Sequence, residues 1–257
     1  MRVMVTVKAY PVLSRKHGEA VCVAGIRIDT GRPEWVRLFP VLFRDMAFAD
    51  QFAKYQVVSV HGTRPNSDLR PESWTPDLSR LAPQEKIGTE KGWRARRAFI
   101  EPVVVPSMCW VQRQQELDGT SLAAFRPAAV DDFTIEPADE VDAVKAEIAA
   151  QRARQGSLWG PGKTPLEPSP YRFRYRYRCL EDGCRGHDQT FIDWEAVAAA
   201  RNWRNDYAEP QLKDKLREKF LDELCGPARD TVFFVGNQHL SPKAFLVLGV
   251  FWPPAQT

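Results

Sequence analysis

The sequence predicts an α+β protein in which a β-barrel-like N-terminal half is followed by a second unit of strands and helices. Three observations support this fold class. Short apolar runs typical of strands fill most of the first 60 residues, and helical periodicity appears only in the second half. A Pro- and Gly-rich stretch at 156–170 separates the last third of the chain. With 257 residues, 44% of them hydrophobic, the chain can bury one large core or two smaller ones.

The strands of the first half are predicted from alternation and from continuous apolar runs. Val3, Val5 and Val7 lie on one face of a strand. Residues 20–28 are almost all apolar, which is typical of a strand buried on both faces. A turn leads from there into an alternating strand at 35–39, so the two segments predict a hairpin.

The middle of the chain gives weaker signals. Residues 57–61 predict a further strand, whereas residues 62–92 are rich in Pro, Asp and Ser and predict a long surface excursion. Residues 103–105 predict a short strand. Residues 108–115 fit a strand and a helix equally well.

The second half alternates strands with helices. Asp193 is a suitable N-cap for the helix that follows it. Helices are predicted over 141–155, 194–204 and 213–224, and strands over 171–178, 231–235 and 244–252.

We therefore divide the chain into three parts. Residues 1–115 form a β-rich, barrel-like domain. Residues 116–170 contain an acidic helix and the Pro/Gly-rich connector. Residues 171–257 form an α+β unit that carries a cysteine/histidine loop.

The most distinctive segment is YRFRYRYR at 171–178. In a strand its aromatic rings lie on one face and its arginines on the other, so we predict that the rings belong to the core. Four like charges spaced about 6.6 Å apart repel one another. Either internal acids, such as those of 118–147, or an external polyanion must offset them. The four candidate nucleic-acid-binding arginines are Arg172, Arg174, Arg176 and Arg178.

Two further groups combine aromatic and basic side chains. Arg94, Arg96 and Arg97 follow a tryptophan, and Trp35 and Arg37 share one face of a strand. Guanidinium groups grip phosphates and rings stack on bases. These five residues are therefore candidates for nucleic-acid binding.

A cysteine/histidine cluster follows the arginine strand directly. Cys179, Cys184 and His187 form a C-x4-C-x2-H pattern, and thiolate and imidazole are the ligands that zinc prefers. A structural zinc site needs four ligands, so one must come from elsewhere. The candidates for the fourth ligand are Cys22, Cys109, Cys225, His239 and Asp188.

Carboxylates just beyond this cluster allow a catalytic alternative. His187, Asp193 and Glu195 could bind a divalent metal that activates water, as in nucleases. The competing interpretation is that Asp193 caps a helix and Glu195 favours the positive end of its dipole. We favour the capping role.

Bulk properties limit the class of protein. The net charge of +3 permits nucleic-acid binding without demanding it, and five cysteines with no secretory leader argue against a disulfide framework. No apolar stretch is long enough to span a membrane. We expect a cytoplasmic protein.

One segment resembles a known family. In Val21–Pro40, VCVAGIRIDTGRPEWVRLFP, the residues Cys22, Gly25, Val36 and Arg37 match the opening of bacterial proteins described as dual OB-domain-containing. The resemblance implies small barrels of the OB or SH3-like type, which often bind oligonucleotides.

The leading hypothesis from the sequence is a nucleic-acid-binding protein, for DNA or RNA, with a structural zinc loop in its second half. Its setting would be a bacterial DNA- or RNA-processing or anti-phage module. One alternative is a metal-dependent nuclease that uses His187, Asp193 and Glu195. The other is a protein-interaction adaptor whose arginine-rich face meets an acidic partner.

Overall fold

A computed structural model describes residues 1–10, 12–14, 18–138 and 167–256. The helix predicted over 141–155 and most of the connector at 156–170 lie outside these residues. Within the described chain, no helix is both long and apolar enough to cross a membrane.

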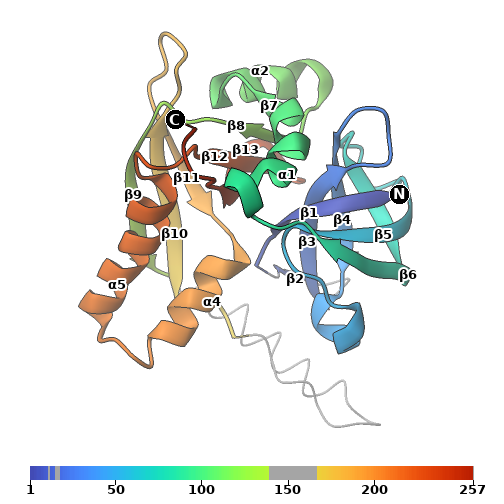
Figure 1. The fold of residues 1–257 in the computed structure, drawn as a ribbon, viewed down its shortest axis with the longest axis horizontal. Coiled ribbons are helices and arrows are strands. Elements are labelled where there is room, and N and C mark those ends of the chain that lie inside the picture. Colours follow the sequence, from blue (N-terminus) through green and yellow to red (C-terminus); the bar gives the residue numbers. More distant parts are fainter. Residues whose placement is uncertain (11, 15–17, 139–166, 257) are drawn as a thin grey trace.

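Five strands of the first half close into a barrel (Figure 1). They are β1 (Arg2–Lys8), β3 (Gly18–Arg27), β4 (Glu34–Val41), β5 (Gln56–Thr63) and β6 (Ser73–Lys86). β1 pairs antiparallel with both β3 and β5, and β6 pairs antiparallel with β5 and parallel with β4. These pairings make a five-stranded Greek-key barrel of the OB type, which confirms the predicted fold class. A short strand, β2 (Val12–Ser14), pairs antiparallel with the first residues of β3.

The apolar run of β3 is explained by burial on both faces, as predicted. Val21 and Val23 point into the barrel core, whereas Ala24 and Ile26 belong to a second core outside the barrel. The barrel is therefore packed against something on its outer side.

The surface excursion predicted at 62–92 is wrong. Its largest part is β6, a strand of 14 residues, and α1 (Glu90–Ile100) begins shortly afterwards. Pro76 and Pro83 obscured the strand, because proline cannot donate to a sheet ladder. The parallel partner β4 pairs with only the first two residues of β6, so both prolines lie beyond it.

The second sheet has seven strands in the order β7-β8-β12-β13-β11-β10-β9. They are β7 (Val104–Val105), β8 (Leu122–Phe125), β9 (Ala129–Pro137), β10 (Tyr171–Arg178), β11 (His187–Phe191), β12 (Val232–Gln238) and β13 (Ser241–Phe251). β7 lies before the predicted domain boundary at residue 115, so the end of the predicted first domain contributes to this sheet.

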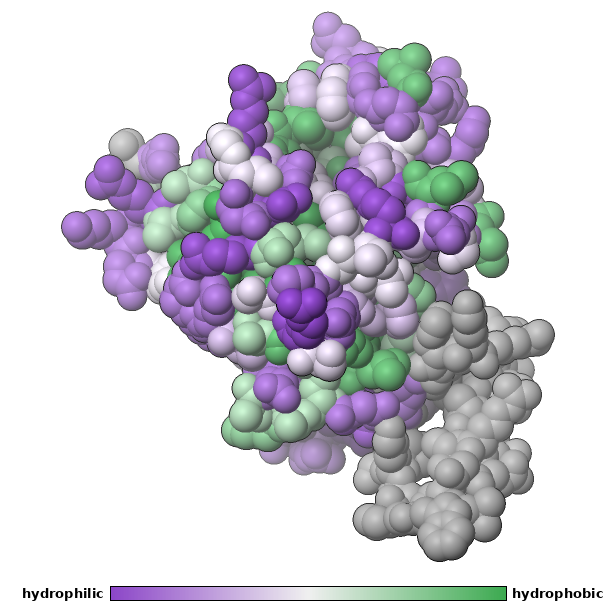
Figure 2. Space-filling view, turned by 90° about the vertical axis from the view of Figure 1, so that its right-hand side faces the viewer, coloured by the Kyte–Doolittle hydropathy of each residue, from purple (hydrophilic) through white to green (hydrophobic). Residues whose placement is uncertain are grey.

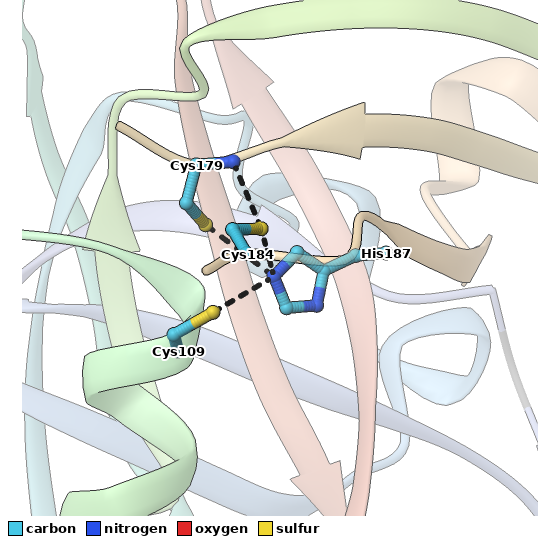
Figure 3. A group of neighbouring side chains, drawn as sticks. All are labelled: Cys109, Cys179, Cys184 and His187. Carbon is cyan, nitrogen blue, oxygen red and sulfur yellow. Dashed lines mark hydrogen bonds between the residues drawn. The ribbon is translucent and has the colours of Figure 1, made fainter. Parts of the chain in front are cut away.

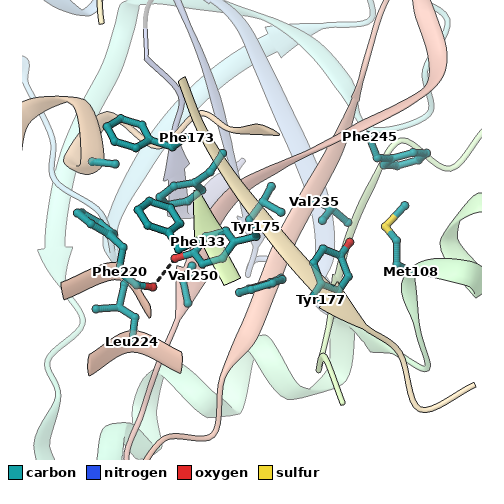
Figure 4. Packing of buried hydrophobic residues seen from close by; sticks show 14 of the residues in the cluster. Met108, Phe133, Phe173, Tyr175, Tyr177, Phe220, Leu224, Val235, Phe245 and Val250 are labelled. Atoms are coloured by element: carbon teal, nitrogen blue, oxygen red, sulfur yellow. Dashed lines mark hydrogen bonds between the residues drawn. The ribbon is translucent and has the colours of Figure 1, made fainter. Parts of the chain in front are cut away.

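Helices cover the face of the second sheet that points away from the barrel (Figure 1). They are α2 (Met108–Asp118), α4 (Trp194–Trp203) and α5 (Glu209–Arg217), which continues as a π-helical turn over Glu218–Glu223. The ambiguous segment at 108–115 is thus helical. The core beneath the helices is rich in aromatic side chains from β9 and β10, as Figure 4 shows for Phe133, Phe173 and Tyr175.

The second sheet is the middle layer of three. Phe233 and Val235 of β12 face the helices, whereas Val232 and Phe234 of the same strand face the barrel. This double burial accounts for the continuous apolar runs of β12 and β13. The barrel side of the molecule, seen in Figure 2, is largely hydrophilic with scattered apolar patches.

Candidate metal centre and its surroundings

Three cysteines and one histidine meet where α2 contacts the β10–β11 hairpin (Figure 3). The ligand atoms of Cys109, Cys179, Cys184 and His187 all lie within 4.8 Å of one another. The Nε2 atom of His187 is 3.4 Å from the sulfurs of Cys109 and Cys179 and 3.5 Å from that of Cys184. The four donors therefore surround a common point.

The hairpin turn is shaped to present its sulfurs inward. Gly183 and Gly186 have φ of 80° and 87°, a region that glycine enters without strain. The backbone N–H groups of Cys179 and Gly186 each donate to the sulfur of Cys184 at 3.4 Å. The ring of Tyr177 stacks on His187 with centroids 5.1 Å apart, which fixes the plane of the imidazole.

The remote ligand comes from the first turn of α2. Ser107 caps this helix, because its side chain accepts a hydrogen bond from the backbone N–H of Trp110. The same hydroxyl bonds to Glu181 of the hairpin turn, so the helix start and the turn are tied together. The backbone N–H of Met108 also donates to the sulfur of Cys179 at 3.3 Å. These contacts place Cys109 opposite the other three ligands.

Burial of the cluster favours neutral thiols for two of its cysteines, so a bound cation would have to displace their protons. Burial raises the pKa of the Cys109 thiol to about 12 and also raises the pKa of Cys179. Burial lowers the pKa of His187, which keeps the imidazole neutral and able to coordinate. Burial would raise the pKa of Cys184 too, but the backbone N–H donors outweigh it and the pKa is lowered. Three thiolates at such short range need a positive charge between them.

Three sulfurs and one imidazole are a common donor set of structural zinc sites. A tetrahedron with Zn–S bonds of about 2.3 Å and a Zn–N bond of about 2.0 Å has sulfur–nitrogen edges of about 3.5 Å. The sulfur–nitrogen distances observed here are 3.4–3.5 Å. All four donors belong to the protein, so the set is that of a closed site without a position for substrate. The arrangement can hold a metal that links α2 to the β10–β11 hairpin.

The sequence predicted three of these residues and included the fourth among five candidates. Of the others, His239 lies 3.5 Å from Asp68, and Asp188 pairs with Arg174. Cys225 donates to a backbone carbonyl at 3.6 Å. No local spacing connects Cys109 with a loop 70 residues later, so the choice depends on how α2 packs.

The arginine strand alternates as predicted. Tyr175 and Tyr177 are buried in the core, and the arginines lie on the opposite face. Arg174 and Arg176 both pair with Asp188, at 2.7 Å and 3.6 Å.

Acids of the preceding strand complete this face. Arg178 pairs with Asp131 at 2.9 Å, and Arg172 lies opposite Glu136 in the β9–β10 register. The sequence left open whether internal acids or an external polyanion offset the charge of the four β10 arginines. In the structure, acids of the protein itself offset this charge, and β9 supplies part of them.

Arg37 and Trp35 lie between the barrel and the second sheet. Arg37 is 2% exposed and donates to the hydroxyl and the carbonyl of Ser121, at 2.6 Å and 2.8 Å. Trp35 packs edge-on against Phe234, with centroids 5.6 Å apart. The prediction that Arg37 grips nucleic acid is corrected, because its guanidinium is enclosed by protein.

The arginines of α1 divide in the same way. Arg96 is 7% exposed and stacks on the ring of Tyr55, and Arg97 is 6% exposed and pairs with Asp230. Both join α1 to its surroundings, so their predicted role in nucleic-acid binding is also corrected. Arg94 is exposed on the same helix.

The structure does not bring the three proposed nuclease residues together. His187 starts β11, and Asp193 follows the other end of that strand, on the order of 20 Å away at about 3.3 Å per residue. Asp193 caps α4 by accepting from the backbone N–H of Glu195, as the capping interpretation predicts. Both carboxylates pair with Lys54 of the barrel. They form a structural contact between the two units.

Comparison with protein families divides the chain at nearly the same place as the fold. A family model described as Domain of unknown function (DUF8757) matches residues 104–257, which is more than half of the chain. The chain belongs to this family. A second model, Domain of unknown function (DUF8758), matches residues 1–102 and so covers the barrel and α1. No curated protein matches the chain.

Proposed function

We propose that this protein binds nucleic acid through the loops of its OB-like barrel, and that a structural zinc ion in the Cys109 centre stabilises its second unit. The observation that carries the first part is the connectivity of the barrel. OB barrels bind oligonucleotides on the face of their second and third strands and on the loops that join strands one and two and strands four and five; here the loop at 64–72 joins strands four and five. The resemblance of Val21–Pro40 to dual OB-domain proteins belongs to the same proposal.

The second sheet restricts where such a ligand can lie. The second and third barrel strands are β3 and β4, and the outward side chains Ala24, Ile26 and Arg37 are covered by the second sheet. The loops at 28–33 and 64–72 remain at the edge of this contact. We assign them to the binding surface.

Exposed cations supply the contacts to phosphate. Arg32 in the loop before β4 and Arg94 in α1 are exposed, and neither forms an ion pair within the described part of the chain. Arg176 and Arg178 form a second group, with side chains 56% and 60% exposed. Ion pairs that are this exposed contribute little, so phosphate oxygens can replace their carboxylate partners.

Salt-dependent binding tests the proposal. Labelled single-stranded DNA or RNA of about 12 nucleotides should bind at about 50 mM salt, with affinity falling linearly on a log–log scale. Replacing Arg32 and Arg94 together by alanine should reduce the magnitude of the slope by about 1.4, which corresponds to two lost phosphate contacts. Arg80→Ala, on the outer face of β6, is the control and should leave the slope unchanged. Absence of binding at low salt would defeat the proposal.

The zinc proposal rests on the donor set and its geometry. A zinc ion held by Cys109, Cys179, Cys184 and His187 would connect the start of α2 to the β10–β11 hairpin. Because a preformed site rarely exists in an unfolded chain, the free energy of metal binding adds to folding stability.

Elemental analysis of protein purified without chelators should find one zinc per chain. Cys109→Ser and Cys184→Ser should each lose the metal and lower the melting temperature. Cys22→Ser is the matched control, because Cys22 lies in β3 and is not part of the cluster. A wild-type protein without stoichiometric zinc contradicts the proposal.

A further inference from the structure

A cleft of about 370 Å³ opens at the junction of the barrel and the second sheet. The barrel contributes Trp35 at the start of β4 and Glu72 in the loop before β6. The opposite wall comes from the second unit, with Trp110 of α2 and Leu122 of β8. Neither unit contains the cleft by itself.

The position of the cleft links it to the proposed function. It lies at the loops at 28–33 and 64–72, beside the part of the barrel face that the second sheet covers. Its volume falls in the range of about 300–1,000 Å³ that is usual for small-molecule sites. The cleft can therefore admit one ring system.

The charges of the lining define what can enter. Glu34 and Glu72 are the ionisable side chains among the described residues that line the cleft, and no lysine or arginine is among them. Glu72 is held in place by the backbone N–H groups of Ser121 and Leu122 and by the Ser121 hydroxyl. Glu34 also pairs with Arg27 at 3.2 Å, so Glu72 is the carboxylate that disfavours phosphate inside the cleft, and an uncharged or cationic group is favoured.

Aromatic surface narrows the ligand further. Tryptophan residues from both units line the cleft, Trp35 from the barrel and Trp110 from the second unit. Stacking on an aromatic ring is a main source of affinity for nucleobases.

From these features we propose that the cleft binds a nucleobase, with Trp35 and Trp110 as its aromatic walls. The ring stacks against indole, and its amino groups donate to the carboxylate side. The phosphates stay outside, near the exposed arginines. This inference rests on the proposed function where the base belongs to a polynucleotide. A free nucleoside offers the same ring chemistry, so the test includes both sources.

The first experiment compares an oligonucleotide with an abasic strand of the same length and charge, using the full-length protein. The base-containing strand should bind about tenfold more tightly, because a stacked base is lost in the abasic strand. Equal binding of the two strands overturns the inference and leaves the proposed function intact. Binding of nucleosides without oligonucleotides supports the cleft and defeats the proposed function. Binding of neither defeats both.

Two variants locate the base. Trp35→Phe keeps an aromatic ring against Phe234 but offers a smaller ring for stacking, so it should weaken binding of the base-containing strand about fivefold and leave binding of the abasic strand unchanged. Trp74→Phe is the control, because Trp74 stacks on Arg64 and does not line the cleft. An equal loss for both strands in Trp35→Phe, or competition by a neutral trisaccharide as effective as that by nucleosides, overturns the assignment.

Discussion

Cationic side chains meet their partners in two regions of this protein, and the energetics of the two regions differ. At the junction between the barrel and the second unit, Arg37, Arg97 and Lys54 are nearly enclosed, with side-chain exposures of 9% or less for the last two. On the outer face of β10, Arg176 and Arg178 keep more than half of their surface in water. Burial, and not the type of residue, decides how strongly each contact contributes to stability.

The junction is built from charges that cannot be hydrated once the two units meet. Removing one partner there leaves the other desolvated, which costs several kcal/mol. On the outer face, water replaces a lost partner at once. The variants below test this difference, from the largest expected effect to the smallest.

The largest effect is expected for Lys54→Met, because Asp193 is 3% exposed and would keep a buried charge without its main partner. We expect a loss of about 3–5 kcal/mol in the free energy of unfolding at pH 8, measured in urea. Burial already raises the pKa of Asp193, and the loss of Lys54 raises it further. A raised carboxyl pKa penalises folding as pH rises from about 4 towards the folded value, so the defect should be smaller at pH 5.

Asp193→Asn separates the charge from the geometry of the junction. Asparagine can still cap α4 but has no carboxyl group to titrate. The double variant Lys54→Met/Asp193→Asn should therefore recover part of the stability and lose the pH dependence. A defect in Lys54→Met that is the same at pH 5 and pH 8 would contradict the buried-charge explanation.

A smaller loss is expected for Arg37→Met. The variant removes two hydrogen bonds to Ser121. It also removes a guanidinium charge whose burial is unfavourable, which is why the pKa of Arg37 is lowered. The gain from removing this buried charge partly offsets the loss of the hydrogen bonds. We expect a net loss of about 2 kcal/mol. Nucleic-acid affinity should be unchanged at temperatures where the variant is folded, and a loss of affinity there would restore Arg37 as a binding residue.

Asp230→Asn should cost about 1–2 kcal/mol near neutral pH, because Asp230 joins Arg97 of α1 to Arg126, the residue after β8. Hydrogen bonds from Arg126 are the main reason that the pKa of Asp230 is lowered. A lowered carboxyl pKa stabilises the fold above about pH 4, and this contribution disappears as pH falls through the folded value. Acid unfolding curves should show a smaller dependence on pH below about 4 in the variant. Identical curves for the two proteins would contradict this assignment.

The smallest effect is expected on the outer face. Arg178→Ala removes an exposed pair with Asp131 and should leave the free energy of unfolding almost unchanged. The same variant should weaken nucleic-acid binding, because the proposed function assigns Arg178 to contacts with phosphate. A stability loss as large as that of Arg37→Met would erase the distinction between the two regions.

Local patterns in the sequence predicted much of the second unit. Period-two alternation assigned Tyr175 and Tyr177 to the core and Arg174 to the surface, and both assignments are correct. Asp193 was recognised as a helix cap because capping involves residues within one turn. These features depend on neighbours in the chain.

Long-range packing decided what the sequence left open. Arg37 looked like a surface residue because its strand alternates normally, yet its partner Ser121 lies 84 residues away. Pro76 and Pro83 concealed β6, since the tolerance of a strand for proline depends on which edge is paired. Local periodicity contains no information on either point.

By itself the sequence determined the strand-rich first half, the two-faced arginine strand and three of the four residues of the candidate metal centre, because each follows from spacing along a strand or turn. Only the tertiary structure decided that Cys109 completes the centre, that the second sheet covers the outer face of the barrel, and that three of the candidate arginines are buried. The physical reason is the same in each case. Burial and coordination are set by surfaces that meet across the fold, whereas spacing in the chain reports only which residues share a face.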